Sequence, residues 1–325
     1  MRRRDFITFV GGAAATWPFA AAAQKPAMPV IGYLHAGSES ANQRIVAAFR
    51  QGLADAGYVE GRNVAIEFRW ANLQFGKLPE MAAELVRLPV AAIVASGAVV
   101  AVLAAKAATS TIPIVMYNGS DPVRYGLVAS LNRPGGNVTG LSLISGELGA
   151  KRLELLREIV PHARTVGYLA GDPGYDEAST ATAAAAKIFG QQLIVLNIGA
   201  ALAIDPAFAT LARRRSDALL VGAFPGAEYY RGKIVTLAAL YKIPAIYPNA
   251  AYVFEGGLMS YSVARGSMHQ LAVQYLAPIL KGAKPADLPV QRPAKFELVI
   301  NLKAANELGL KVPRLLLTRA DELIE

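Results

Sequence analysis

Polar and aromatic side chains suited to holding a small molecule follow most of the short apolar runs of the sequence. Hydroxyl, amide, carboxylate and imidazole groups exchange hydrogen bonds with a ligand, and aromatic rings can enclose its apolar part. The helical pattern that begins after Gly97 would add free backbone amides for a carboxylate. We therefore predict a ligand-binding site composed of His35, Ser38, Ser96, Gly97, Asn118, Asp121, Asp172, Tyr175, Phe224, Asn249 and Tyr261.

Each of these residues also has a structural interpretation. Aromatic rings at strand ends commonly cap a core, and pairs such as Asp121-Pro122 and Asp172-Pro173 commonly form turns. The prediction therefore depends on the set, because the fold fixes where the loops lie but does not require all of them to be polar.

Patterns that carry catalysis or bind cofactors are absent from the sequence. No two glycines are separated by a single residue, which excludes the dinucleotide fingerprint, and no Gly-x-Ser-x-Gly elbow is present. The chain has no cysteine, and His35, His162 and His269 lack the spacing of metal ligands. We expect no catalytic residue, no metal and no cofactor, so the chain is predicted not to be an enzyme.

Alternating strands and helices must position the predicted site. Short apolar runs at 30–34, 64–68, 91–94 and 112–115 read as buried parallel strands, and helical patterns lie between them. After the break at 134–140, a second series has runs at 166–169, 193–196, 219–221, 243–246 and 258–259. Parallel strands need right-handed crossovers, so we predict an α/β fold of two Rossmann-like lobes with parallel sheets. Loops at the carboxyl ends of such strands form the ligand site where the lobes face each other.

The first 24 residues have the pattern of an export signal. Arg2 and Arg3 lead into Asp5 and Phe6, a stretch rich in Gly and Ala follows, and small residues precede Gln24. Paired arginines indicate the twin-arginine type, whereas a retained membrane anchor is the alternative. Without a cysteine there is no site for a lipid anchor, so we expect a soluble periplasmic protein.

The net charge of the chain is positive, as it is in many proteins that bind nucleic acid. The formal charge of +9 becomes +7 when residues 2–5, which sum to +2, leave with the signal. Arg213-Arg214-Arg215 has no interleaved aromatic residues on which bases could stack, so a solvated helix face is favoured and nucleic acid is not expected as a partner.

Several motifs resemble a large family of bacterial ABC-transporter substrate-binding proteins, including its tryptophan and tyrosine binders. They cover nearly the whole chain after the signal and comprise Ser120-Asp121-Pro122-Val123, 126–131, 134–140, Gly256-Gly257-Leu258-Met259-Ser260-Tyr261, 279–290, 296–303 and Arg319-Ala320-Asp321-Glu322.

The resemblance implies a type I periplasmic-binding-protein fold with a hinge of three crossings, near 141–146, 262–267 and 290–296. Lobe 1 would comprise 28–143 and a return at 265–290, and lobe 2 would comprise 146–262. Residues 291–325 would form the third crossing and a C-terminal segment of lobe 2. In relatives, the position of Asp121 lies in a loop at the cleft.

The resemblance further implies a monomer that closes on a small solute and delivers it to an ABC permease in the inner membrane. An amino acid, aromatic or branched, is the leading expectation for the solute. The family often has glycine and an acidic residue after Tyr261, where this chain has Ser262-Val263-Ala264-Arg265-Gly266. Because Arg265 would favour an anionic group, small carboxylates come next.

Two alternatives stay open at the level of sequence. A sensory binding protein that presents its closed form to a membrane receptor would share this fold. An exported hydrolase could use Asp121 or Asp172 with a bound water, although no activated nucleophile is visible.

Overall fold

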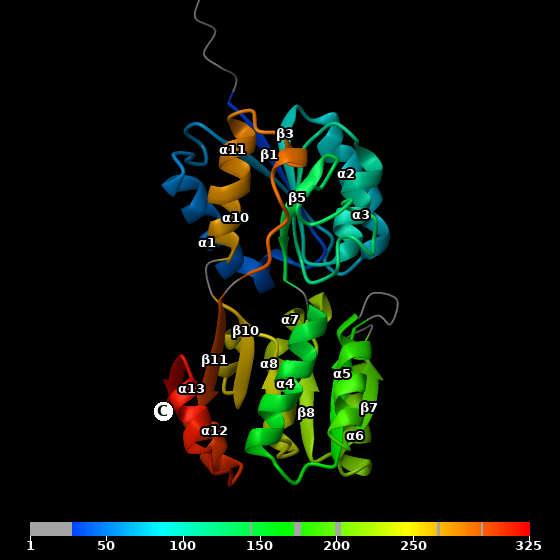
Figure 1. The fold of residues 1–325 in the computed structure, drawn as a ribbon, viewed down its shortest axis with the longest axis vertical. Coiled ribbons are helices and arrows are strands. Elements are labelled where there is room, and N and C mark those ends of the chain that lie inside the picture. The colour runs from blue at the N-terminus through cyan, green and yellow to red at the C-terminus, as the bar shows by residue number, and fades with distance from the viewer. Residues whose placement is uncertain (1–27, 144, 172–176, 199–202, 265–266, 294) are drawn as a thin grey trace, which may run out of the picture.

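The computed structural model describes residues 28–143, 145–171, 177–198, 203–264, 267–293 and 295–325. The predicted signal peptide at 1–24 lies outside these ranges. Two lobes, each with a central sheet and helices on both faces, lie end to end (Figure 1). No helix in the described ranges has both the length and the apolar character of a membrane span.

Lobe 1 contains a five-stranded parallel sheet in the order β2-β1-β3-β4-β5. Its strands are β1 (Val30–His35), β2 (Ala65–Trp70), β3 (Val90–Ser96), β4 (Ile114–Asn118) and β5 (Val138–Ser142). Its helices are α1 (Glu39–Asp55), η1 (Phe75–Lys77), α2 (Leu78–Arg87), α3 (Val99–Ala108), α10 (Ser267–Leu271), η3 (Ala272–Leu276), α11 (Ala277–Leu280) and η4 (Pro285–Asp287).

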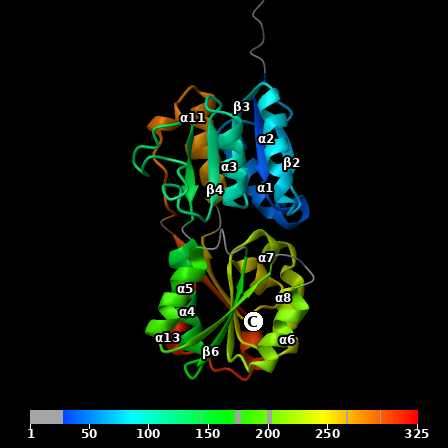
Figure 2. The same cartoon turned by 90° about the vertical axis from the view of Figure 1, so that its right-hand side faces the viewer.

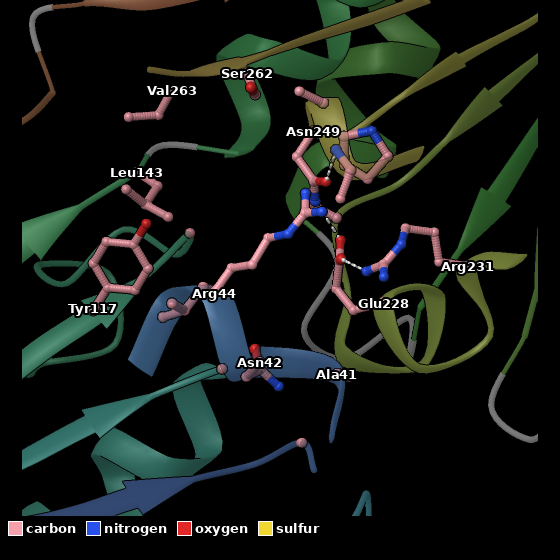
Figure 3. Close-up of a pocket in the computed structure, with 18 of the residues that line it drawn as sticks. Ala41, Asn42, Arg44, Tyr117, Leu143, Glu228, Arg231, Asn249, Ser262 and Val263 are labelled. Atoms are coloured by element: carbon pink, nitrogen blue, oxygen red, sulfur yellow. Dashed lines mark hydrogen bonds and ion pairs between the residues drawn. The ribbon is translucent and has the colours of Figure 1, made fainter. Parts of the chain in front are cut away.

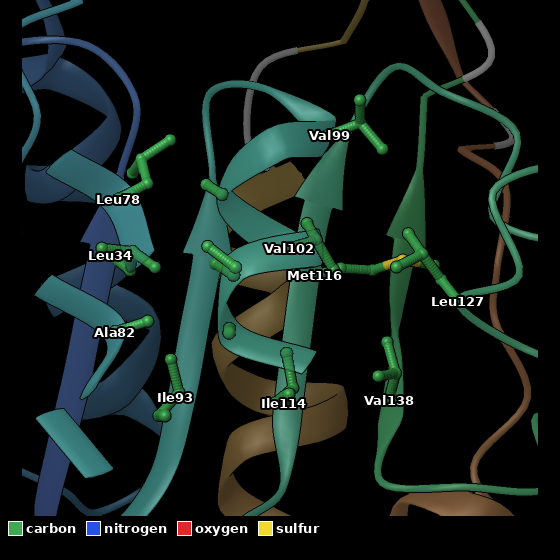
Figure 4. Close-up of a cluster of buried hydrophobic side chains, with 14 of the residues drawn as sticks. Leu34, Leu78, Ala82, Ile93, Val99, Val102, Ile114, Met116, Leu127 and Val138 are labelled. Atoms are coloured by element: carbon green, nitrogen blue, oxygen red, sulfur yellow. The ribbon is translucent and has the colours of Figure 1, made fainter. Parts of the chain in front are cut away.

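Both faces of this sheet are buried, as continuous apolar strands require. One face packs on α2 and α3 through a cluster that contains Leu34, Ile93 and Leu78 (Figure 4). The opposite face packs on α1, α10, η3 and α11, where Phe49 and Leu276 belong to one cluster with the strands. The helices from 267 to 280 therefore cover a sheet whose strands all precede residue 143.

Lobe 2 contains a seven-stranded sheet in the order β12-β11-β10-β9-β8-β6-β7. Its strands are β6 (Thr165–Ala170), β7 (Gln192–Asn197), β8 (Ala218–Val221), β9 (Ala245–Tyr247), β10 (Met259–Val263), β11 (Phe296–Asn301) and β12 (Glu322–Ile324). Its helices are α4 (Ser145–Ile159), α5 (Glu177–Ile188), α6 (Ile204–Arg213), α7 (Pro225–Tyr229), α8 (Arg231–Leu240), α9 (Ala250–Phe254), α12 (Leu302–Glu307) and α13 (Arg314–Arg319).

The second sheet departs from the all-parallel expectation at one place. Strands β10 and β11 pair antiparallel, whereas the other pairs of this sheet are parallel. The chain leaves β10, builds α10 to η4 in lobe 1, and re-enters lobe 2 from the hinge side (Figure 1). Strand β11 therefore runs in the opposite direction to strands β6 to β10 of this sheet.

Three passages of the chain connect the lobes: after β5, after β10 and before β11 (Figures 1 and 2). The first and third passages are linked, because Ser142 N donates to Gln291 O at 3.0 Å and Gln291 N donates to Gly140 O at 3.0 Å. Gly140 has φ +132°, and a Cβ atom there would collide with the carbonyl oxygen of Met116. Only glycine lets β5 approach β4 this closely beside the hinge.

Candidate ligand-binding site

A cavity of about 570 Å³ lies between the lobes. Lobe 1 contributes the start of α1 and the loops after β3 and β4, and lobe 2 contributes α4, α7, α9 and the loops after β8, β9 and β10. The parallel strands of each lobe point their carboxyl ends toward this space, which is where open α/β sheets bind ligands. Figure 3 shows side chains from both lobes entering it.

His35, at the end of β1, lines the cavity with an uncharged imidazole ring. Its Nδ1 accepts a hydrogen bond from Gly37 N at 2.8 Å, which leaves Nε2 as the protonated nitrogen. Burial lowers the pKa of His35 to about 4, so the ring carries no charge at neutral pH. Gly97, at φ +87°, makes room for this ring, because a Cβ atom there would lie 2.6 Å from His35 Cε1.

Asn118, at the end of β4, is 4% exposed, and the oxygen of its side-chain amide is hydrogen-bonded. Its Oδ1 accepts from Ser120 N at 2.9 Å, and its backbone carbonyl accepts from Leu143 N at 2.8 Å. The side-chain nitrogen Nδ2 is buried and has no hydrogen-bond partner among the residues that the structure describes.

Glu228, in α7, is the centre of a charged cluster on lobe 2. Its Oε1 accepts from Asn249 Nδ2 at 2.7 Å, and its Oε2 lies 3.6 Å from Arg231 Nη1 (Figure 3). Arg231 also pairs with Glu255 at 2.7 Å. Burial outweighs the nearby cation and raises the pKa of Glu228 to about 7, so its charge changes near neutral pH.

Arg152, in α4, is a buried cation that reaches the cavity wall with 2% exposure. Its Nε donates to Tyr261 O at 2.7 Å and its Nη2 donates to Pro248 O at 3.2 Å. Within the described ranges no carboxylate lies within ion-pair distance of this guanidinium. Desolvation lowers the pKa of Arg152 to about 10, which still leaves it charged at neutral pH.

Aromatic and aliphatic side chains complete the lining. Tyr117, Leu143 and Val263 lie on one side of the cavity, away from Glu228 and Arg231 on the other (Figure 3). Phe224 and Phe254 also line it from lobe 2.

A cation–π contact joins the two lobes across the cavity. Arg44 projects from α1 toward lobe 2, where its Cζ lies 5.8 Å from the centre of the Phe254 ring (Figure 3).

The structure brings six of the predicted residues together in the lining: His35, Ser38, Gly97, Asn118, Phe224 and Asn249. Asp172 and Tyr175 lie outside the described residues.

Three other predicted residues do not line the cavity. Ser96 is buried and donates from Oγ to Tyr33 Oη at 3.4 Å. Asp121 is exposed and accepts from Val123 N at 2.9 Å, which is a turn-forming role. The Tyr261 ring stacks on Phe296, with centres 5.7 Å apart, and only its carbonyl serves the site through Arg152.

Sequence reasoning missed the charged residues of the lining, namely Arg44, Arg152, Glu228, Arg231 and Glu297. The first four lie in helices, whereas the prediction considered the loops directly after the strands. A search extended by two helical turns beyond each predicted strand would have included Glu228, which follows the run at 219–221. As a whole, the site offers donors, acceptors and apolar walls for a small molecule.

Comparison with known proteins agrees with this geometry. Residues 34–324 match the family described as ABC transporter substrate binding protein. The chain belongs to this family. Its members bind substrates and are not enzymes, which confirms both the family and the non-enzymatic function predicted from the motifs.

Individual relatives support the assignment. A tyrosine-binding protein from Clostridioides difficile is 27% identical over 286 residues, 84% of this chain and 80% of that protein. A Streptococcus pneumoniae ABC domain solved in complex with L-Trp is 28% identical, with a TM-score of 0.82 over 91% of this chain and 99% of that chain. A conserved domain protein from Vibrio cholerae is 27% identical, with a TM-score of 0.83 and the same two coverages, 91% and 99%. The predicted type I periplasmic-binding-protein fold is thereby confirmed, with two α/β lobes and mostly parallel sheets.

Proposed function

We propose that this protein is the periplasmic solute-binding component of an ABC importer, closes its lobes on an amino acid with an aromatic side chain, and passes it to a permease. The cavity of about 570 Å³ between the lobes carries the proposal. Sites for small molecules typically span about 300–1,000 Å³ and combine apolar walls with a few polar groups.

The lining suits a zwitterion with a ring. Phe224, Tyr117 and Leu143 offer apolar contact, Arg152 offers a cation, and Glu228 and Glu297 offer carboxylates. Relatives that bind tyrosine and L-Trp support an aromatic side chain over a branched one. Closure of the lobes needs only contacts that differ between the open and closed states. The solute is therefore bound without being chemically changed.

Calorimetry on protein lacking residues 1–24, unfolded and refolded to remove carried solute, tests the proposal. L-tryptophan, L-tyrosine and L-phenylalanine should bind at micromolar or tighter Kd, and small-angle scattering should show a more compact particle with solute. Phe224→Ala should weaken binding, whereas the control Phe296→Ala, outside the cavity, should not. Absence of heat with every amino acid would refute the choice of solute.

Export and delivery need separate measurements. Replacing Arg2 and Arg3 with lysine should retain the protein in the cytoplasm if the twin-arginine route carries it. Deleting the gene should abolish uptake of the labelled solute at micromolar concentration; uptake unchanged by the deletion would contradict a role in import.

A further inference from the structure

We infer that the solute's carboxylate binds at the hinge end of the cavity, on hydrogen-bond donors that both lobes supply: Asn118 from lobe 1, and Arg152 and Ser262 from lobe 2. The inference rests on the proposed function and specifies how the site recognises its solute.

Arg152 is the strongest sign of a missing anion. A cation with 2% exposure is costly to bury unless a negative charge or a full set of acceptors compensates it. Two backbone carbonyls accept from Nε and Nη2, Nη1 has no acceptor among the described residues, and Glu228 attracts the group only from beyond ion-pair distance. A solute carboxylate would complete this set.

Asn118 and Ser262 are incomplete in a similar way. Asn118 and Ser262 both line the cavity. Asn118 Nδ2 and Ser262 Oγ are buried and have no hydrogen-bond partner in the described structure. Buried polar groups in folded proteins nearly always have partners, so two exceptions in one cavity indicate groups that await a ligand. The amide nitrogen can only donate, which requires an acceptor on the solute.

All three residues lie beside the crossings between the lobes. Asn118 O accepts from Leu143 N at the first crossing, and Arg152 holds the carbonyl of Tyr261, the residue before Ser262 at the second. Figure 3 shows Ser262 with Val263 and Leu143 on the side of the cavity opposite Glu228 and Arg231.

A carboxylate bound here would link lobe 1 to lobe 2 and so favour closure. Glu228, which lines the cavity on the side opposite Ser262, offers a contact for an ammonium group. The donors therefore define one end of the solute only.

The first test compares L-tryptophan with L-tryptophanamide, which keeps the ring and the ammonium but lacks the carboxylate. The amide should bind about thirtyfold more weakly or worse, because charge-assisted hydrogen bonds are lost. Binding of the amide within about twofold of the acid would overturn the inference.

The second test changes the donors. Asn118→Asp keeps the acceptor for Ser120 N but replaces the donor with a carboxylate, so affinity for L-tryptophan should fall about tenfold or more. Asn306→Asp, the same change on the exposed face of α12, is the control and should bind as the parent does. Ser262→Ala should weaken binding about threefold while leaving the unfolding temperature of the free protein unchanged or higher, since it removes an unpartnered hydroxyl.

Circular dichroism first establishes that each variant is folded. A folded Asn118→Asp protein with unchanged affinity would overturn the inference even if substitutions of Arg152 prevent folding.

Failure of the proposed function can be distinguished from failure of this inference. If no amino acid binds, the same comparison is made with 3-indolepropionate and phenylacetate against their amides. Acids that bind more tightly than their amides support the inference without the amino-acid assignment. Equal binding, or binding of neither acid, overturns it.

Discussion

Glu228→Gln should make the free protein more stable at pH 8 and leave it nearly unchanged at pH 5. The substitution keeps the shape of the side chain and removes its charge. In the folded protein, burial raises the pKa of Glu228 to about 7 from an ordinary value of 4.5. Arg231 keeps its contact with Glu255 at 2.7 Å in the variant, so the cation does not lose its partner.

The sign and size of the effect follow from proton linkage. Because the folded carboxyl holds its proton more tightly, its favourable contribution is full below pH 4.5 and is lost as pH rises through about 7. One pKa unit corresponds to about 1.4 kcal/mol, which sets an upper limit of about 3 kcal/mol. The side chain is 26% exposed to the cavity, and water there reduces the penalty, so we expect a gain of about 1–3 kcal/mol at pH 8.

Urea unfolding of ligand-free protein between pH 5 and 8 measures the effect. His35 acts in the opposite direction, because burial lowers its pKa to about 4 and the folded state loses stability as the pH falls below the ordinary value of 6.5. Variant and parent must therefore be compared at each pH, where the contribution of His35 cancels.

Glu255→Gln is the matched control, since Glu255 contacts the same arginine from an exposed position. It should give no gain at pH 8. A Glu228→Gln protein that is less stable than the parent at pH 8 would refute the reasoning, because the Glu228 anion would then be a net stabilising partner of Arg231.

Three further predictions concern other parts of the molecule. In a double-mutant cycle on solute affinity, Arg44→Ala and Phe254→Ala should couple by about 0.5–1 kcal/mol, as a half-exposed cation–π contact does, whereas strictly additive effects would exclude a joint role in closure. Gly140→Ala should destabilise the protein by about 2–4 kcal/mol in denaturant unfolding, because its Cβ meets the Met116 carbonyl, and a loss below about 1 kcal/mol would contradict the tight approach of β5 to β4. Asn301→Ala removes the side-chain cap of α12 and should cost about 1 kcal/mol by the same measurement; no loss would mean that water replaces the cap.

The architecture was predictable because apolar runs and helical patterns alternate so regularly. The runs at 30–34 and 166–169, for example, are the strands β1 and β6. The sequence prediction ended the strand β10 at Met259, whereas it extends to Val263, because the buried Ser260 and Ser262 interrupt the apolar run. Strand β12 was not predicted within the C-terminal segment of lobe 2, since three partly exposed residues at a sheet edge carry too little pattern.

The lining of the cavity was predictable at the strand ends. His35 and Asn118 are the last residues of β1 and β4, Asn249 follows shortly after β9, and the strand-end rule places all three in the lining. Arg152 and Glu228 were missed because a charged residue within a helix reads as part of its solvated face, whereas Arg152 is buried on the carbonyls of Tyr261 and Pro248. Which helix turns face the opposite lobe depends on the hinge geometry, and a single sequence does not encode that in any local pattern.

Three of the helices that cover one side of the lobe 1 sheet, α10, η3 and α11, are translated only after most of lobe 2. A ribosome that has completed residue 263 has released all five strands of lobe 1, yet α10, η3 and α11, which cover Tyr33 and Val115, do not exist. Lobe 2 is equally unfinished, because β11 and β12 come later still. Nascent chains should therefore keep apolar surface open until the last few dozen residues emerge, and the two halves should reach their native state together at the end of synthesis.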